Sequence, residues 1–299
     1  MTMPSADGVG NDLACRVADC ALRAMLYEAC VSPKPGLVDR FNSGAHRDMD
    51  IFTFMDSSCA LRVYFRDVTL LGQTHAATPP ENLLPHLRRT GVLAENVMMA
   101  ATGGVNTHKG LIFSLGIICA ALGQAYVADE APSVNTLLGR SAHIAAPALD
   151  ELTRLSPAGA STRGEALNLR YGVTGIRGEA AAGFPSVRRW GLPVLKRYLS
   201  GGASINDAGV AVLLNMMANV ADTNMIGRSG MAAFKGLQSE LGARIRDDAL
   251  TIGQIVAIAS ELDKLLSASN ISPGGCADLL AITLALHFME KDELIKCKM

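Results

Sequence analysis

The sequence predicts an all-α protein built as one large, bundle-like domain. Apolar residues recur with helical spacing along nearly the whole chain, and no stretch alternates apolar and polar residues as a half-buried strand does. Ala, Leu and Met, all strong helix formers, dominate the composition, and only 5% of the residues are aromatic. Since 49% of the 299 residues are hydrophobic, a sizeable core is available. No domain-separating linker appears, so we expect one domain over 12–299 after a disordered tail over 1–11.

Five helices are expected in the first half of the chain. In the first of them, Leu13, Val17, Ala21 and Met25 fall on one side. The five predicted helices cover 12–31, 50–71, 81–101, 109–128 and 133–155.

The fourth of these helices is the most apolar part of the chain. No charged residue occurs over 110–128, which approaches the roughly 20 residues that a membrane span needs. Polar and small residues such as Ser114 and Gln124 interrupt it, and no basic cluster flanks it. We therefore expect a buried core helix, and we keep a membrane or scaffold bundle as an alternative.

Six helices are expected in the second half of the chain. The last one has Ser272 in position to act as its N-cap, with Pro273 in the first turn. The six predicted helices cover 164–172, 184–199, 204–221, 229–246, 251–268 and 274–290.

Composition excludes several classes of function. A net charge of −1 argues against a nucleic-acid partner, which usually requires a basic face. The seven cysteines show no zinc-ligand spacing, and reduced thiols are typical of a cytoplasmic protein. The first residues lack the apolar stretch of a secretory signal. We expect a cytoplasmic protein that binds neither nucleic acid nor membrane.

Five short polar segments, most of them framed by Gly, interrupt this apolar chain. Each follows or opens a predicted helix, so the segments can meet at one end of a bundle. We expect them to converge on one cleft. These polar segments are 34–49, 103–110, 174–179, 222–230 and 272–278.

Together the polar segments resemble the triphosphoribosyl-dephospho-CoA synthase family, whose members make the prosthetic-group precursor of citrate lyase and whose relatives serve malonate decarboxylase. The resemblance spans about 24–286 and is most specific in 34–49 and 104–110. Cys276 stands where we expect Ser, and Arg47 stands where Lys is common. Neither difference removes a carboxylate.

The resemblance implies a reaction in which the 5-triphosphoribosyl group of ATP passes to the 2′-hydroxyl of 3′-dephospho-CoA and adenine leaves. The ribose C1 then becomes oxocarbenium-like, the attacking hydroxyl needs a base, and the triphosphate needs Mg²⁺ and cationic side chains. The predicted substrates are ATP and 3′-dephospho-CoA, the predicted cofactor is Mg²⁺, and a homodimer is kept open as the assembly.

Candidate residues follow from these requirements. Lys, Arg, Asn and a Gly at a helix start suit phosphate and nucleotide, and the predicted ATP- or phosphate-binding residues are Lys34, Arg40, Asn42, Asn106, His108, Lys109, Gly110, Arg177 and Asn224. Carboxylates suit Mg²⁺, and its predicted ligands are Asp39, Asp48 and Asp278. The predicted catalytic residues are Asp222, Glu179 and His46.

Asp222 is our first choice for the base. It ends an apolar helical run, where desolvation raises the pKa of a carboxyl group toward a value useful for accepting a proton. A plain N-cap for the next turn is the structural alternative. The histidines His46 and His108 suit either protonation of adenine or phosphate binding.

Other functions remain open at this point. Neither a P-loop nor a GxGxxG signature is present, so a common ATP-binding fold is not expected. A Mg²⁺-dependent all-α hydrolase of nucleotides or ADP-ribosyl groups would use similar carboxylates with water as the acceptor. The same transferase reaction serving malonate decarboxylase is a further alternative to citrate lyase.

Overall fold

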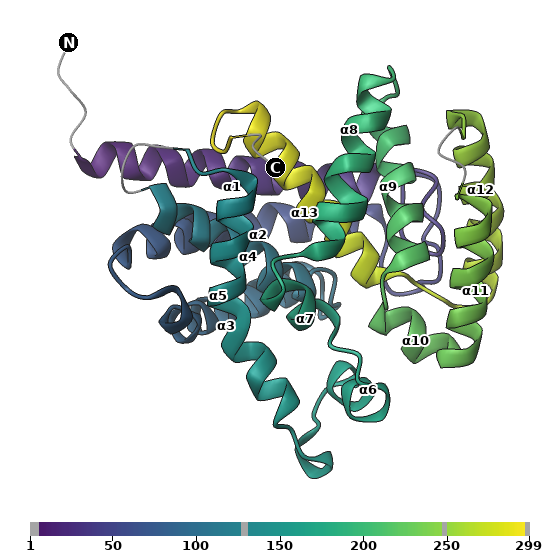
Figure 1. Ribbon diagram of the computed structural model, residues 1–299, viewed down its shortest axis with the longest axis horizontal. Helices are drawn as coiled ribbons and strands as arrows, with labels where there is room; N and C mark the ends of the chain where they lie inside the picture. Colours follow the sequence, from purple (N-terminus) through teal and green to yellow (C-terminus); the bar gives the residue numbers. More distant parts are fainter. Residues whose placement is uncertain (1–5, 127–130, 247–249, 297–299) are drawn as a thin grey trace.

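The computed structural model describes residues 6–126, 131–246 and 250–296. Over these residues the chain is helical, with no strand beyond one isolated bridge between Ser133 and Lys296, and the all-α prediction is confirmed (Figure 1). The first helix begins at Ala6, so the prediction of a disordered tail over 1–11 is wrong for 6–11. Residues 1–5 of that tail lie outside the described part.

The predicted helices are all present, most with ends shifted by one to three residues. The helices are α1 (Ala6–Cys30), α2 (Ile51–Thr74), α3 (Leu84–Ala101), α4 (Lys109–Ala125), α5 (Val134–Thr153), α6 (Arg163–Tyr171), α7 (Gly175–Ala181), α8 (Leu192–Ser200), α9 (Ile205–Asn219), α10 (Thr223–Ser229), α11 (Met231–Arg244), α12 (Ile252–Ala268) and α13 (Gly274–Lys291). Short helical turns cover Pro80–Asn82, Pro157–Gly159 and, in π geometry before α8, Val187–Gly191.

Helices α7 and α10 were not predicted. Each has seven residues; α10 lies inside the polar segment 222–230, and α7 begins inside 174–179 and ends at Ala181. Seven residues are too few to reveal an apolar period, and so short a helix depends on tertiary packing for its stability.

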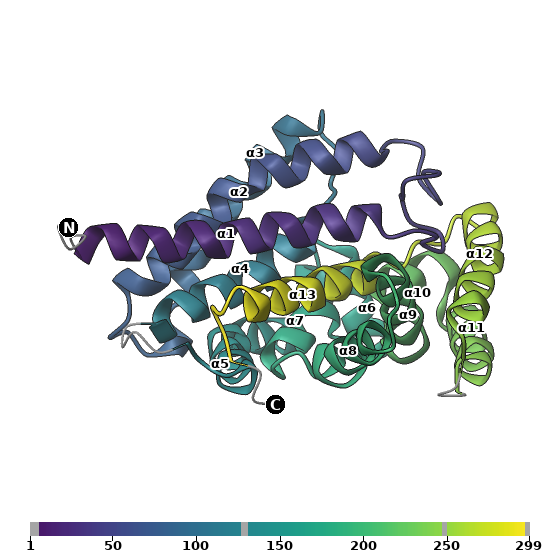
Figure 2. The same ribbon diagram turned by 90° about the horizontal axis from the view of Figure 1, so that it is seen from above.

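Helix α4 lies at the centre of the molecule. It packs against α2, α5 and α13, and α1 lies between α2 and α13 (Figure 2). Nearly all of α4 from Leu111 to Gln124 is buried, which confirms the prediction of a core helix. No helix in the described residues has both the length and the apolar character needed to cross a membrane.

Two glycines allow α2 and α4 to approach closely. A Cβ atom at Gly72 would lie 2.1 Å from the carbonyl oxygen of Ala120, and one at Gly123 would lie 2.1 Å from that of Thr69. Any side chain at either position would therefore push the helices apart. This close approach lies near the C-terminal ends of both helices. Residues nearer their N-terminal ends, such as Phe54 of α2 and Lys109 of α4, line the cavity described next.

Candidate active site

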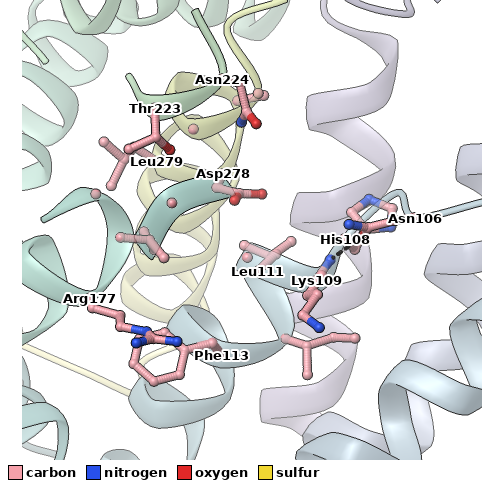
Figure 3. A pocket seen from close by; sticks show the side chains of 18 of the residues that line it. Asn106, His108, Lys109, Leu111, Phe113, Arg177, Thr223, Asn224, Asp278 and Leu279 are labelled. Atoms are coloured by element: carbon pink, nitrogen blue, oxygen red, sulfur yellow. Dashed lines mark hydrogen bonds between the residues drawn. The ribbon is translucent and has the colours of Figure 1, made fainter. Parts of the chain in front are cut away.

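One cavity of about 1200 Å³ collects residues from all five polar segments. This confirms the predicted convergence on one cleft. Figure 3 shows side chains from the starts of α4, α10 and α13 around this space. The predicted site residues on its wall are Lys34, His46, Asp48, Asn106, His108, Lys109, Gly110, Arg177, Glu179, Asp222, Asn224 and Asp278.

Asp39 does not line the cavity, so the structure does not bring it together with the other predicted metal ligands, Asp48 and Asp278. It is buried within its own loop, where its carboxylate accepts hydrogen bonds from three backbone N–H groups. The donors are Lys34 at 3.1 Å, Phe41 at 2.7 Å and Asn42 at 3.0 Å. Asp39 therefore shapes the first polar segment and has little capacity left for a ligand.

Arg40 and Asn42 also lie off the cavity wall, apart from the other predicted nucleotide ligands. The guanidinium of Arg40 donates to Ser32 Oγ at 3.2 Å and to Asn206 Oδ1 at 3.0 Å. The amide of Asn42 donates to Asp263 Oδ2 at 3.0 Å. Both side chains dock the first polar segment onto neighbouring helices.

Four helices begin on the cavity wall. Their first residues, Lys109 of α4, Gly175 of α7, Thr223 of α10 and Gly274 of α13, all line it. A helix N-terminus carries a partial positive charge and unpaired N–H groups, which favour bound anions. The two long helices among them, α4 and α13, therefore make this end of the molecule suitable for phosphate groups.

Asp222 is the N-cap of α10. Its Oδ1 accepts hydrogen bonds from the backbone N–H groups of Asn224 (2.7 Å) and Met225 (3.0 Å), and its Oδ2 accepts one from Cys276 in the first turn of α13 (2.8 Å). The side chain is 2% exposed. Burial raises its pKa, and these hydrogen bonds oppose that rise. Asp222 thus ties together the starts of two helices, which argues against its prediction as the base.

Asp278, two residues after Cys276 in α13, has a contrasting environment. In the described part of the chain no side-chain or backbone group donates a hydrogen bond to its carboxylate, and it faces the cavity (Figure 3). Gly110 lies against it, since a Cβ atom there would come within 2.1 Å of Asp278 Oδ2. Burial, followed by the charges of Glu28 and Asp222, raises the pKa of Asp278 well above its usual value. Its oxygens are open, and its raised pKa gives it a stronger affinity for a proton than an ordinary aspartate has.

Lys34 is not a free cation. It is 1% exposed, and its Nζ lies 2.6 Å from Glu28 Oε1 in a buried ion pair. Both residues line the cavity. The sequence analysis did not identify Glu28, because it lies within the first predicted helix, where nothing in the apolar pattern distinguishes it from a solvated residue.

Besides Arg88, which lies 2.7 Å from Glu151, three more cations line the cavity. Lys109 Nζ lies 2.7 Å from Glu95, and an Arg177 nitrogen lies 3.1 Å from Glu165. Arg228 instead donates to the main-chain and side-chain oxygens of Asn270 at 3.1 and 3.0 Å, with no carboxylate partner among the described residues. Its charge is therefore less neutralised than the others. The sequence analysis placed Arg228 in a polar segment without assigning it a role.

His46 and Glu179 are both held by serine hydroxyl groups. His46 Nε2 lies 2.9 Å from Ser272 Oγ, so Ser272 is not the N-cap that we expected, and α13 begins only at Gly274. Burial and the nearby charge of Arg228 lower the pKa of His46. Glu179 Oε1 accepts a 2.6 Å hydrogen bond from Ser186, while burial raises the pKa of Glu179.

Mg²⁺ would depend on its nucleotide for most of its ligands. Among the described residues no group of three or more His, Cys, Asp and Glu side chains is arranged to hold a metal ion. Mg²⁺ bound with a nucleotide needs only one or two carboxylates, because phosphate oxygens and water complete its shell. Asp48 fits this need, since its side chain is 66% exposed and lines the cavity, and its Oδ1 lies 3.9 Å from Nδ1 of His46.

The sequence matches one family over almost its whole length. Residues 14–296 match the model of the ATP:dephospho-CoA triphosphoribosyl transferases. The chain belongs to this family of enzymes. The resemblance stated from the five polar segments is therefore confirmed.

Several similar proteins carry the name of the enzyme that defines this family. The 2-(5″-triphosphoribosyl)-3′-dephosphocoenzyme-A synthase of Pectobacterium atrosepticum is 40% identical over 265 residues, covering 88% of this chain and 86% of the relative. Probable synthases of the same name from Vibrio cholerae and Streptococcus pyogenes are 39% and 37% identical, covering 91% and 92% of this chain and 87% and 97% of the relatives. No solved structure matches the sequence.

Proposed function

We propose that this enzyme transfers the 5-triphosphoribosyl group of ATP to the 2′-hydroxyl of 3′-dephospho-CoA. The observation that carries this proposal is the large cavity on which all five polar segments converge. Its volume of about 1200 Å³ exceeds the roughly 300–1,000 Å³ typical of a site for one ligand, so two nucleotide substrates have room to meet there.

Phosphate groups are expected at the starts of α4 and α13. Their N–H groups and partial positive charge suit a triphosphate, and Lys109, Arg177 and Arg228 add cationic side chains on the same wall. Mg²⁺ would be held by Asp48 together with triphosphate oxygens, and it would neutralise phosphate charge.

Asp278 is proposed as the carboxylate that acts on the acceptor. In the reaction the C1–N9 bond of ATP breaks, a C1–O bond to the 2′-hydroxyl forms, and the hydroxyl proton must be taken up as adenine leaves with the bonding electron pair. In its ionised form the open carboxylate of Asp278 can accept that proton, and its negative charge then also stabilises an oxocarbenium-like C1. Asp222, with three N–H donors, is less able to do either.

The product would be the prosthetic-group precursor for the acyl carrier protein of citrate lyase, with malonate decarboxylase as the alternative recipient. A reaction that consumes ATP and dephospho-CoA fits a cytoplasmic enzyme.

Product analysis tests the proposal. The purified enzyme is incubated with ATP, Mg²⁺ and 3′-dephospho-CoA, and the mixture is separated and weighed by mass spectrometry. We expect adenine in equal amount to a product whose mass equals the two substrates minus adenine. A parallel reaction with 2′-deoxy-dephospho-CoA should give neither. Adenine or phosphate release that proceeds without any acceptor would instead identify a hydrolase.

A further inference from the structure

The ring of His108 has one satisfied and one unsatisfied nitrogen. His108 directly precedes α4, is 3% exposed and lines the cavity, beside Asn106 and Lys109 in Figure 3. Its Nδ1 lies 2.7 Å from the hydroxyl of Ser57 on α2. Its Nε2 is buried and finds no hydrogen-bond partner in the described part of the protein. A buried polar atom without a partner is rare in native proteins, and a bound ligand atom or an ordered water can satisfy it.

The hydroxyl network around Ser57 decides which ring nitrogen carries the hydrogen. Thr107 Oγ1 donates a 2.7 Å hydrogen bond to Ser57 Oγ, so the proton of Ser57 must go elsewhere. Among the described residues His108 Nδ1 is the acceptor available to it. Ser57 therefore donates to Nδ1, and this assignment places the ring hydrogen of His108 on Nε2.

The surroundings keep this ring neutral. Phe54 contacts it edge to face with centroids 5.1 Å apart, and the backbone N–H of His108 donates to the sulfur of Met98. Burial, followed by the positive charge of Lys34, lowers the pKa of His108 to about 3. A neutral imidazole with hydrogen on Nε2 donates a hydrogen bond but has no second proton to release.

We propose that Thr107 and Ser57 act as positioning residues that fix His108 as a neutral Nε2–H donor to an unprotonated acceptor atom of the bound nucleotide. The acceptor is either a ring nitrogen of the adenine or a phosphate oxygen. His108 then stabilises the bound or departing group without transferring a proton. This inference rests on the proposed function only for the identity of the bound nucleotide. The tautomer of His108 and its unpaired Nε2–H donor are inferred from the contacts of the protein itself.

The tautomer can be read directly by ¹⁵N NMR of the full-length enzyme labelled at histidine. We expect the resonances of His108, assigned with His108→Gln, to report a neutral ring with hydrogen on Nε2 from about pH 5 to about pH 8. A ring with hydrogen on Nδ1, or one that titrates within this range, would overturn the proposal. This readout needs no turnover, so it remains valid even if the enzyme proves to catalyse another reaction.

Ser57→Ala tests whether the hydroxyl of Ser57 fixes the tautomer of His108. Ser58→Ala is its matched control. Ser58 is equally buried on the same helix, but its hydroxyl donates to the carbonyl of Phe54 and does not touch His108. We expect Ser57→Ala to give a mixture of His108 tautomers and to lower kcat/KM by about threefold to tenfold, the typical contribution of one hydrogen bond. Ser58→Ala should keep the parent tautomer and kcat/KM. Equal values of both quantities in the two variants would show that Ser57 does not position the ring.

Nucleotide analogues identify the acceptor. His108→Gln keeps an N–H donor near the position of Nε2, whereas His108→Phe keeps the ring shape without it. We expect kcat/KM with ATP to fall at least about tenfold in His108→Phe and less in His108→Gln. If the acceptor is a ring nitrogen, 3-deaza- or 7-deaza-ATP will abolish the difference between the variants; if it is a phosphate oxygen, the difference will persist with both. Identical kinetics of parent and His108→Phe with ATP would refute the donor role.

Discussion

Asp222 and Asp278 lie on the same cavity wall and both follow or open apolar helices, yet their surroundings differ completely. Asp222 receives three backbone N–H groups from α10 and α13, whereas Asp278 receives no hydrogen bond from the described residues. The first arrangement stabilises the fold, and the second leaves a carboxylate available to a substrate. A carboxylate near a cavity is therefore better judged by its remaining acceptor capacity than by its position in a motif.

The largest effect is expected from Asp278→Asn. If Asp278 accepts the proton of the acceptor hydroxyl, the variant should lose about 10²–10⁴ in kcat, because loss of a general base typically costs that much. Its thermal unfolding should match or exceed that of the parent, since no hydrogen bond is lost. Chromatography of the released adenine checks the loss of kcat, and a thermal melting curve checks the stability. Turnover at the parent rate would show that Asp278 is not the base, and Asp222 and Glu179 would then be the next residues to test.

Asp222→Ala should act mainly on stability. The substitution leaves three N–H groups unpaired, so we expect the free energy of unfolding to fall by about 2 kcal/mol or more in urea titrations. Asp50→Ala provides a comparison, because Asp50 caps α2 with a single backbone acceptor contact to Thr53 and does not line the cavity. Its loss should cost about 1 kcal/mol. A parent-like stability for Asp222→Ala, together with lost turnover, would contradict the structural role.

Arg228 and Arg40 allow the same comparison between a side chain available to a substrate and one used by the fold. Arg228 lies on the cavity without a carboxylate partner in the described chain, while Arg40 is bound to Ser32 and Asn206 away from it. We expect Arg228→Gln to raise the KM of at least one substrate about tenfold, equivalent to about 1.4 kcal/mol. Arg40→Gln should change neither KM by more than about twofold. Steady-state kinetics with each substrate varied in turn distinguishes the two outcomes.

The smallest effect is the pH dependence of stability that Asp278 contributes. Because burial raises its pKa in the folded state, the native protein holds a proton that the unfolded chain releases above about pH 3.9. The free energy of unfolding therefore falls as pH rises from that value toward the raised pKa, by at most about 1.4 kcal/mol per pH unit. Urea titrations should show this slope in the parent and a flatter one in Asp278→Asn. Parallel slopes would indicate an ordinary pKa for Asp278.

Helix prediction succeeded where the apolar period was long. The run over 109–128 corresponds to α4, and the run over 204–221 corresponds to α9. It failed for α7 and α10, whose seven residues begin with Gly175 and Thr223 inside polar segments. Their stability comes from packing against α5 and α11, respectively, which local sequence does not encode.

The sequence by itself determined the all-α class, the family and the five segments that supply the cavity, because apolar periodicity and dense polar motifs are local properties of the chain. Only the tertiary structure decided which polar groups remain available. Asp39 and Asp222 accept hydrogen bonds from backbone N–H groups, and Lys34 is neutralised by Glu28. By contrast, the carboxylate of Asp278 faces the cavity, and His108 Nε2 is buried without a partner among the described residues. The physical reason is that a hydrogen bond or buried ion pair depends on which elements meet in space, and residues as distant in sequence as Asp222 and Cys276 become partners only in the folded protein.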